Sequence, residues 1–116
     1  MPEASLSFAE VRFIDREEVL ADLRRAAAAA RRACAEIRRV FLIGSLVRGN
    51  WTAASDADVV VVVEREFADL LERSRYQIHS AMIPTDTLVY TKAEFEALAA
   101  DPHSVLSQNL ACALEL

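Results

Sequence analysis

The sequence predicts a single α/β domain in which a small sheet is flanked by helices. Three observations predict this fold class: helical periodicity of apolar residues over 15–39, two short and strongly apolar runs at 40–43 and 58–64, and the alternation of helical and strand-like segments along the chain. Such an alternation is typical of a sheet that packs against helices. At 116 residues the chain is long enough for one core, so we treat residues 1–116 as one domain.

The first helix is predicted over residues 15–39. Asp15 is a suitable N-cap, and Glu17 and Glu18 follow in the first turn, where the helix dipole favours acids. Apolar side chains recur on one face at spacings of three and four residues. They are Val19, Leu20, Leu23, Ala26, Ala27, Ala30, Cys34 and Ile37.

Arginines recur at seven-residue intervals on the opposite face of this predicted helix. The stripe indicates either a solvated polar face or a docking surface for an acidic partner. Because the net charge of the chain is −5, we favour a protein partner and expect no direct binding to nucleic acid. The arginines are Arg24, Arg25, Arg31, Arg32, Arg38 and Arg39.

The middle of the chain predicts two strands joined through a short helix. A buried strand is expected at 40–43, ended by Gly44, and a short helix follows over 45–49. Residues 50–55 are polar and predict a crossing loop. The run at 58–64 is apolar on both faces, so we expect a central strand that is covered on both sides.

The last part of the chain predicts a second helix over 65–80 and a third strand over 88–91. Thr91 and Glu94 have the spacing of a capping box, which predicts a helix that begins directly after the strand. A last, apolar helix is expected over 102–114.

Bulk properties exclude a membrane protein and a disulfide scaffold. No segment approaches the ~20 apolar residues that a membrane span needs, and the start of the chain lacks a signal pattern. We therefore expect a cytoplasmic location. Cys34 and Cys112 are far apart in the sequence, and we expect both to be small buried side chains without a disulfide.

The strongest functional signal lies in residues 44–58. Asp56 and Asp58 are two residues apart at the start of a strand, so both side chains point to the same side. They are either solvated acids before a strand or ligands of a divalent cation that offsets their repulsion. Gly44 and Ser45 either end the strand and cap the helix or hold nucleotide phosphates, and Arg48 either neutralises phosphate charge or pairs with an acid. At this spacing we favour metal-assisted nucleotidyl or phosphoryl transfer.

This pattern resembles the minimal nucleotidyltransferases of the DNA polymerase beta superfamily. Their signature is Gly-Ser, ten residues and Asp-x-Asp, and it is met here by Gly44, Ser45, Asp56 and Asp58. The further matches are Arg48-Gly49 inside the spacer, Ser55 before the first Asp, and Asp86 on a later strand.

The resemblance implies the mixed sheet of the polymerase beta palm, Mg²⁺ as cofactor and ATP as co-substrate. The metal ligands and catalytic carboxylates that it implies are Asp56, Asp58 and Asp86, with Asp86 also a general base toward the acceptor hydroxyl. The nucleotide-binding residues that it implies are Gly44, Ser45 and Arg48. The residues alone leave a second interpretation for Asp86, a turn acid that follows Pro84.

Members of this size resemble the antitoxin of two-gene toxin–antitoxin systems whose toxin is a HEPN-type helical ribonuclease. The resemblance implies AMPylation, the transfer of AMP from ATP to a tyrosine hydroxyl of that toxin. The chain leaves no room for an acceptor-binding domain, so we expect a homo- or hetero-oligomer, with the apolar last helix buried against a partner. Two alternatives stay open: a non-catalytic module that masks its partner, and a nucleotidyltransferase of small molecules such as antibiotics.

Overall fold

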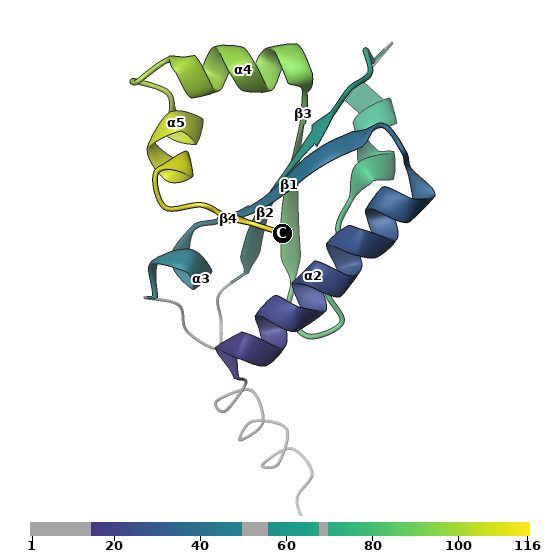
Figure 1. The fold of residues 1–116 in the computed structure, drawn as a ribbon, viewed down its shortest axis with the longest axis vertical. Helices are drawn as coiled ribbons and strands as arrows, with labels where there is room; N and C mark the ends of the chain where they lie inside the picture. Colours follow the sequence, from purple (N-terminus) through teal and green to yellow (C-terminus); the bar gives the residue numbers. More distant parts are fainter. Residues whose placement is uncertain (1–14, 50–55, 68–69) are drawn as a thin grey trace, which may run out of the picture.

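A four-stranded mixed sheet organises the part of the chain that the computed structural model describes, residues 15–49, 56–67 and 70–116 (Figure 1). The strands lie in the order β3-β2-β1-β4, with β2 and β3 parallel and the other neighbours antiparallel. The strands are β1 (Ile37–Ile43), β2 (Ala57–Val63), β3 (Thr85–Thr91) and β4 (Leu114–Glu115). The helices are α2 (Arg16–Ala33), α3 (Ser45–Arg48), the 3-10 helix η1 (Leu70–Tyr76), α4 (Lys92–Ala100) and α5 (Val105–Leu110).

Helices cover both faces of the sheet, which confirms the predicted fold class. Figure 1 shows α2 on one side of the strands and α4 with α5 on the other. The valines of β2 alternate between these two cores: Val59 and Val61 pack with α2, and Val60 and Val62 pack with α4 and α5. Because β2 is buried on both faces, its sequence is a continuous apolar run rather than an alternating one. No helix in the described ranges is long and apolar enough to span a bilayer.

Helix α2 begins as the sequence predicts but ends earlier. The Asp15 carboxylate accepts a hydrogen bond from the Glu17 amide, which confirms the N-cap. The helix stops at Ala33, so the prediction that it extends to residue 39 was wrong. Residues 37–39 belong to β1, because β1 pairs along the whole of β2 and Ile37 lies opposite Val63. The segment contains no Gly or Pro, so no breaker marks the end of the helix in the sequence.

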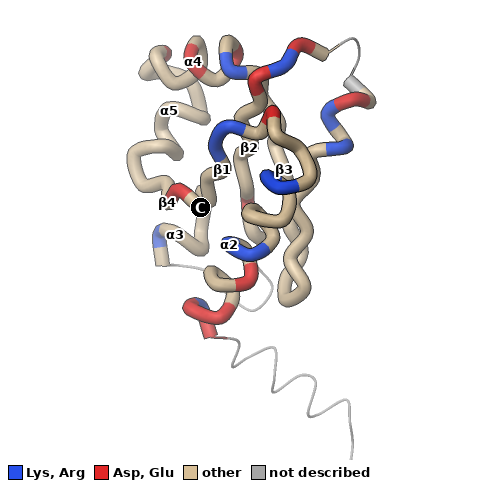
Figure 2. Tube along the Cα trace, turned by 45° about the vertical axis from the view of Figure 1, so that its right-hand side comes forward, with Lys and Arg blue, Asp and Glu red and all other residues tan. Residues whose placement is uncertain are grey.

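The predicted arginine stripe is therefore divided between two elements. Four of its six members lie on α2, whereas Arg38 and Arg39 lie at the start of β1, where the trace in Figure 2 is blue. Both arginines are already paired, Arg38 with Glu64 and Arg39 with Glu115. The stripe is not one continuous helical surface.

The helix predicted over 65–80 is also wrong. The chain forms only the 3-10 helix η1, and residues 77–80 run without regular structure. Leu71 is 81% exposed, while Tyr76 and Ile78 are fully buried. The reason is the neighbouring strand: the Ile78 amide donates to the hydroxyl of Thr87, which ties this segment to β3.

The end of the chain differs from the prediction of one long helix. The capping box of Thr91 and Glu94 is present at the start of α4. Helix α5 is short and capped by Ser104, and the chain then returns to the sheet as β4. Ala111, Cys112 and Ala113 therefore connect two elements, and the prediction of a buried Cys112 is wrong because its side chain is exposed. Cys34 is partly buried, and both cysteines are free thiols as expected.

Candidate active site

The sheet brings two of the predicted acids side by side. Asp58 on β2 pairs in register with Ile43, the last residue of β1, and with Asp86 on the parallel strand β3. This confirms that the strand of Asp86 lies beside that of Asp58. Side chains of paired residues point to the same face, and Val60, on the same face as Asp58, packs with α4 and α5. Asp58 and Asp86 therefore lie at one end of the sheet, on the face that α4 and α5 cover further along.

The third acid, Asp56, lies immediately before β2 and is exposed. It is two residues from Asp58, so both are directed toward the same face if the strand geometry extends to it. Asp86 is also exposed, whereas Asp58 is partly buried. Ser55 and the loop predicted at 50–55 lie outside the described residues.

Gly44 packs its backbone against the Asp58 carboxylate. Its φ of 88° lies in the region that residues with a Cβ rarely adopt. A Cβ built on Gly44 would lie 2.7 Å from Oδ2 of Asp58, too close for any side chain. Glycine is thus required at this turn for two reasons: the positive φ, and the closeness of the Asp58 carboxylate.

The short helix α3 follows the Gly44 turn and contains the other two residues predicted to bind the nucleotide, Ser45 and Arg48. Gly44, not Ser45, is its N-cap, and its carbonyl accepts from the amides of Val47 and Arg48. The interpretation of Ser45 as the capping residue is therefore wrong, since no side chain caps this helix. Ser45 is the first residue of α3, directly after the Gly44 that lies against Asp58, and Arg48 is the last. Arg48 is close enough to Asp58 to lower the pKa of its carboxyl.

The surroundings of Asp58 disfavour its charged form. Partial burial raises the pKa of Asp58, repulsion from Asp86 and Asp56 raises it further, and attraction to Arg48 opposes the rise. The folded chain therefore holds a carboxylate where its charge is disfavoured. A bound cation would relieve that penalty.

Asn109, which the sequence analysis did not identify, accepts a hydrogen bond from the Arg48 side chain. The side-chain amide nitrogen of Asn109 on α5 donates to the carbonyl of Val105, and its oxygen accepts from a guanidinium nitrogen of Arg48 at 3.3 Å. The first hydrogen bond orients the amide for the second. Sequence inspection could not find Asn109, because the two residues are 61 positions apart and α5 was predicted with other bounds.

The carboxylates suit a hard divalent cation such as Mg²⁺, whose preferred ligands are oxygens. Within the described ranges, no group of three or more His, Cys, Asp or Glu side chains is gathered closely enough to enclose a metal ion. Mg²⁺ does not require such an enclosure, because it is commonly held by one or two carboxylates together with waters and substrate phosphates. Asp58 and Asp86, in register on adjacent strands, are the pair that fits this mode.

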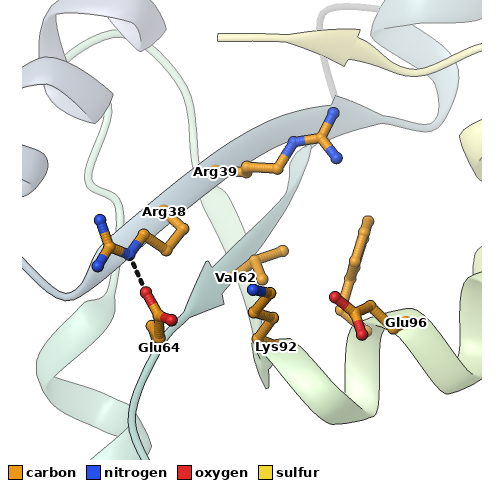
Figure 3. Close-up of a pocket in the computed structure, with 7 residues that line it drawn as sticks. Arg38, Arg39, Val62, Glu64, Lys92 and Glu96 are labelled. Carbon is orange, nitrogen blue, oxygen red and sulfur yellow. Dashed lines mark ion pairs between the residues drawn. The ribbon is translucent and has the colours of Figure 1, made fainter.

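A cavity of about 510 Å³ lies at the opposite end of the sheet (Figure 3). Val62, in its wall, is four residues along β2 from Asp58, roughly 13 Å away, so the cavity and the acids are separate. The ion pair of Arg38 and Glu64 lies on one side of it, as the dashed line shows. The lining residues are Arg38, Arg39, Val62, Glu64, Lys92, Phe95 and Glu96.

Comparisons with known proteins show the family and the fold. The profile of the family described as "Nucleotidyltransferase domain" matches residues 23–109, a range that contains all six candidate residues. A crystal structure of a Sulfolobus solfataricus protein provisionally assigned as a nucleotidyltransferase is similar in fold, with a TM-score of 0.57 and 18% sequence identity. The similarity covers 71% of this chain and 75% of that one. A search of curated proteins found no match. Because the family profile spans most of the sequence, the chain belongs to the nucleotidyltransferase domain family.

Proposed function

We propose that this chain is a Mg²⁺-dependent nucleotidyltransferase that transfers AMP from ATP to a tyrosine hydroxyl of a HEPN-type toxin, and so acts as an antitoxin. The observation that carries the catalytic part is the pairing of Asp58 with Asp86 on adjacent parallel strands, with the Gly44 turn against the Asp58 carboxylate. Two acids held together raise the energy of the folded chain, and metal binding gives a reason for that cost.

The residues divide the chemistry between them. Asp58 and Asp86 would hold Mg²⁺, with Asp56 as a further ligand when the nucleotide is bound, and the ion would supply positive charge beside the triphosphate and the attacking oxygen. The acceptor oxygen forms a bond to the α-phosphorus, the bond from that phosphorus to the bridging oxygen breaks, and pyrophosphate leaves. In this proposal Asp86 takes the proton of the acceptor hydroxyl.

The α3 segment supports the nucleotide in this proposal. The Gly44 turn leaves room for phosphate oxygens to approach the backbone, and the hydroxyl of Ser45 supplies a further donor. Arg48, held by Asn109, neutralises phosphate charge and opposes the rise in the pKa of Asp58.

The protein partner rests on the family resemblance and on one feature of the fold. The α4–α5 layer covers β1 and β2, while Leu88 on β3 remains about half exposed beside Asp86. An acceptor on another chain can reach the acids over this uncovered strand.

Two alternatives make different predictions. A module that only masks its partner would have no use for carboxylates that repel one another, so the raised pKa of Asp58, caused by burial and by Asp86, favours an enzyme. A small-molecule transferase would use the same acids but would modify an antibiotic rather than a protein. The identity of the modified molecule separates all three.

The test is intact mass spectrometry of the purified chain, mixed with a co-purifying HEPN partner, ATP and Mg²⁺. We expect the partner to gain the mass of AMP, and Asp58→Asn to abolish the gain. Glu96→Gln is the matched control, because Glu96 is an exposed acid beside the far cavity and should leave transfer intact. A stable complex without any mass gain would instead favour the masking module.

A further inference from the structure

Strand β3 presents a half-exposed leucine directly beside the acids. Leu88 follows Asp86 by two residues, so both side chains lie on the same face of the sheet. Its register partner on β2 is Val60, which is fully buried, whereas Leu88 is 46% exposed. Helices α4 and α5 therefore cover β2 at Val60 but leave β3 exposed to solvent at Leu88.

The two faces of β3 differ in what covers them. Thr85 and Thr87 lie on the face opposite Asp86 and Leu88, where the amides of Ser80 and Ile78 donate to their hydroxyls. Leu88, on the same face as Asp86, stays 46% exposed. A molecule that approaches Asp86 across this face therefore meets Leu88.

We propose that Leu88 is the specificity-determining residue for the acceptor, and that it selects a hydroxyl carried on an apolar body, such as a phenol, over a sugar hydroxyl. This inference rests on the proposed function. Two residues of strand span roughly 6.6 Å, so a phenol whose oxygen lies at Asp86 places its ring over Leu88. Burial of that apolar contact favours binding.

A sugar in the same position would lose hydration without compensation. Its hydroxyls surround the ring, and those that face Leu88 would find no hydrogen-bond partner in the leucine side chain. The wall of the site that discriminates between acceptors is thus a single aliphatic side chain, next to the acid that receives the proton.

The experiment measures Mg²⁺- and ATP-dependent AMP transfer to two small probes, N-acetyltyrosinamide as the phenol and kanamycin as the sugar acceptor. We expect the native chain to prefer the phenol. Leu88→Ser should lower kcat/KM for the phenol about tenfold through KM, with the KM for ATP unchanged and kanamycin affected less than twofold. Leu88→Met, which keeps an apolar side chain of similar size, should retain the preference.

Val105→Ser is the matched control, because Val105 is 73% exposed on α5 and should not contact the acceptor. An equal loss for both acceptors in Leu88→Ser, or an equal loss in Val105→Ser, overturns the inference. A native chain that binds Mg²⁺ and ATP in calorimetry but prefers kanamycin, or modifies neither probe, overturns it as well. A native chain that binds no ATP refutes the proposed function itself.

Discussion

At the scale of single residues, the geometry of the site depends most on Gly44. We expect Gly44→Ala to displace the Asp58 carboxylate, because the new Cβ would lie 2.7 Å from Oδ2, and so to abolish nucleotide transfer. Strain at the positive φ should add roughly 1–3 kcal/mol of lost stability. Urea unfolding and a transfer assay measure the two effects.

Gly49→Ala separates strain from displacement. Gly49 has a similar φ of 86°, but a Cβ there meets nothing within 4 Å. It should lose comparable stability while keeping activity. Equal activity loss in the two variants would show that Gly44 is needed only for its conformation.

We expect replacement of Asp58 to increase stability while it removes activity. Its pKa is raised, first by burial and then by Asp86 and Asp56, so its ionised form destabilises the folded chain above that pKa. Without metal, Asp58→Asn should therefore raise the free energy of unfolding at pH 7 and abolish transfer. The stability difference should disappear as pH falls below the pKa of the unfolded aspartate, near 3.9. A variant that is less stable than the native chain at pH 7 would contradict this assignment.

Asn109 predicts an effect on nucleotide affinity. Asn109→Ala removes the acceptor that holds Arg48, so we expect a KM for ATP raised a few-fold with kcat nearly unchanged. Asn109→Asp keeps an acceptor oxygen and should rescue most of the loss. A loss of kcat in both variants would show that α5 acts through the fold rather than through Arg48.

At the scale of elements, the ion pair of Arg73 and Glu94 joins η1 to the start of α4. The side-chain hydrogen bonds from Arg73, with the Thr91 amide, lower the pKa of Glu94 to about 2. Because the folded pKa is depressed, the stabilisation is present above the usual pKa of 4.5 and is lost as pH falls from there toward 2. The Glu94 side chain is 43% exposed, so solvent screening reduces the stabilisation from this ion pair to about 1 kcal/mol.

Glu94→Gln tests this pair by urea unfolding at pH 7 and pH 3. Glutamine can still serve the capping box, so the variant removes the ion pair more than the cap. We expect the native chain to lose its advantage over the variant at the lower pH. Glu96→Gln, two residues away in the same helix and exposed, should show no such dependence.

Element types were predictable from the sequence where a local signal existed. The apolar run of β2, the Asp15 cap and the capping box of α4 are local, and all three are present. Residues 37–39 were assigned to the wrong element because the pairing of β1 with β2 is a tertiary contact that overrides the helical pattern. The same holds for the segment after β2, whose path is set by contacts to Thr85 and Thr87.

At the scale of the whole molecule, the acids of the site were predictable and their surroundings were not. The spacing from Gly44 to Asp58 and the register of Asp86 follow from the sequence, and the structure places Gly44 against Asp58 and Asp86 in register with Asp58. The catalytic and metal-binding roles of these residues remain predictions. The hydrogen bond of Asn109 to Arg48 and the exposure of Leu88 depend on how α4 and α5 pack on the sheet, which no local sequence pattern encodes.

The valine strand has a consequence for folding in the cell. Residues 59–63 are five consecutive valines, uncharged and suited to intermolecular β-pairing whenever the chain is unfolded. Asp58 and Glu64 flank this run as charged gatekeepers, so the acid that serves the site also discourages aggregation. Asp58→Asn would then make the native state more stable but lower the yield of refolding. Light scattering during dilution from urea would measure the increased aggregation of the unfolded chain.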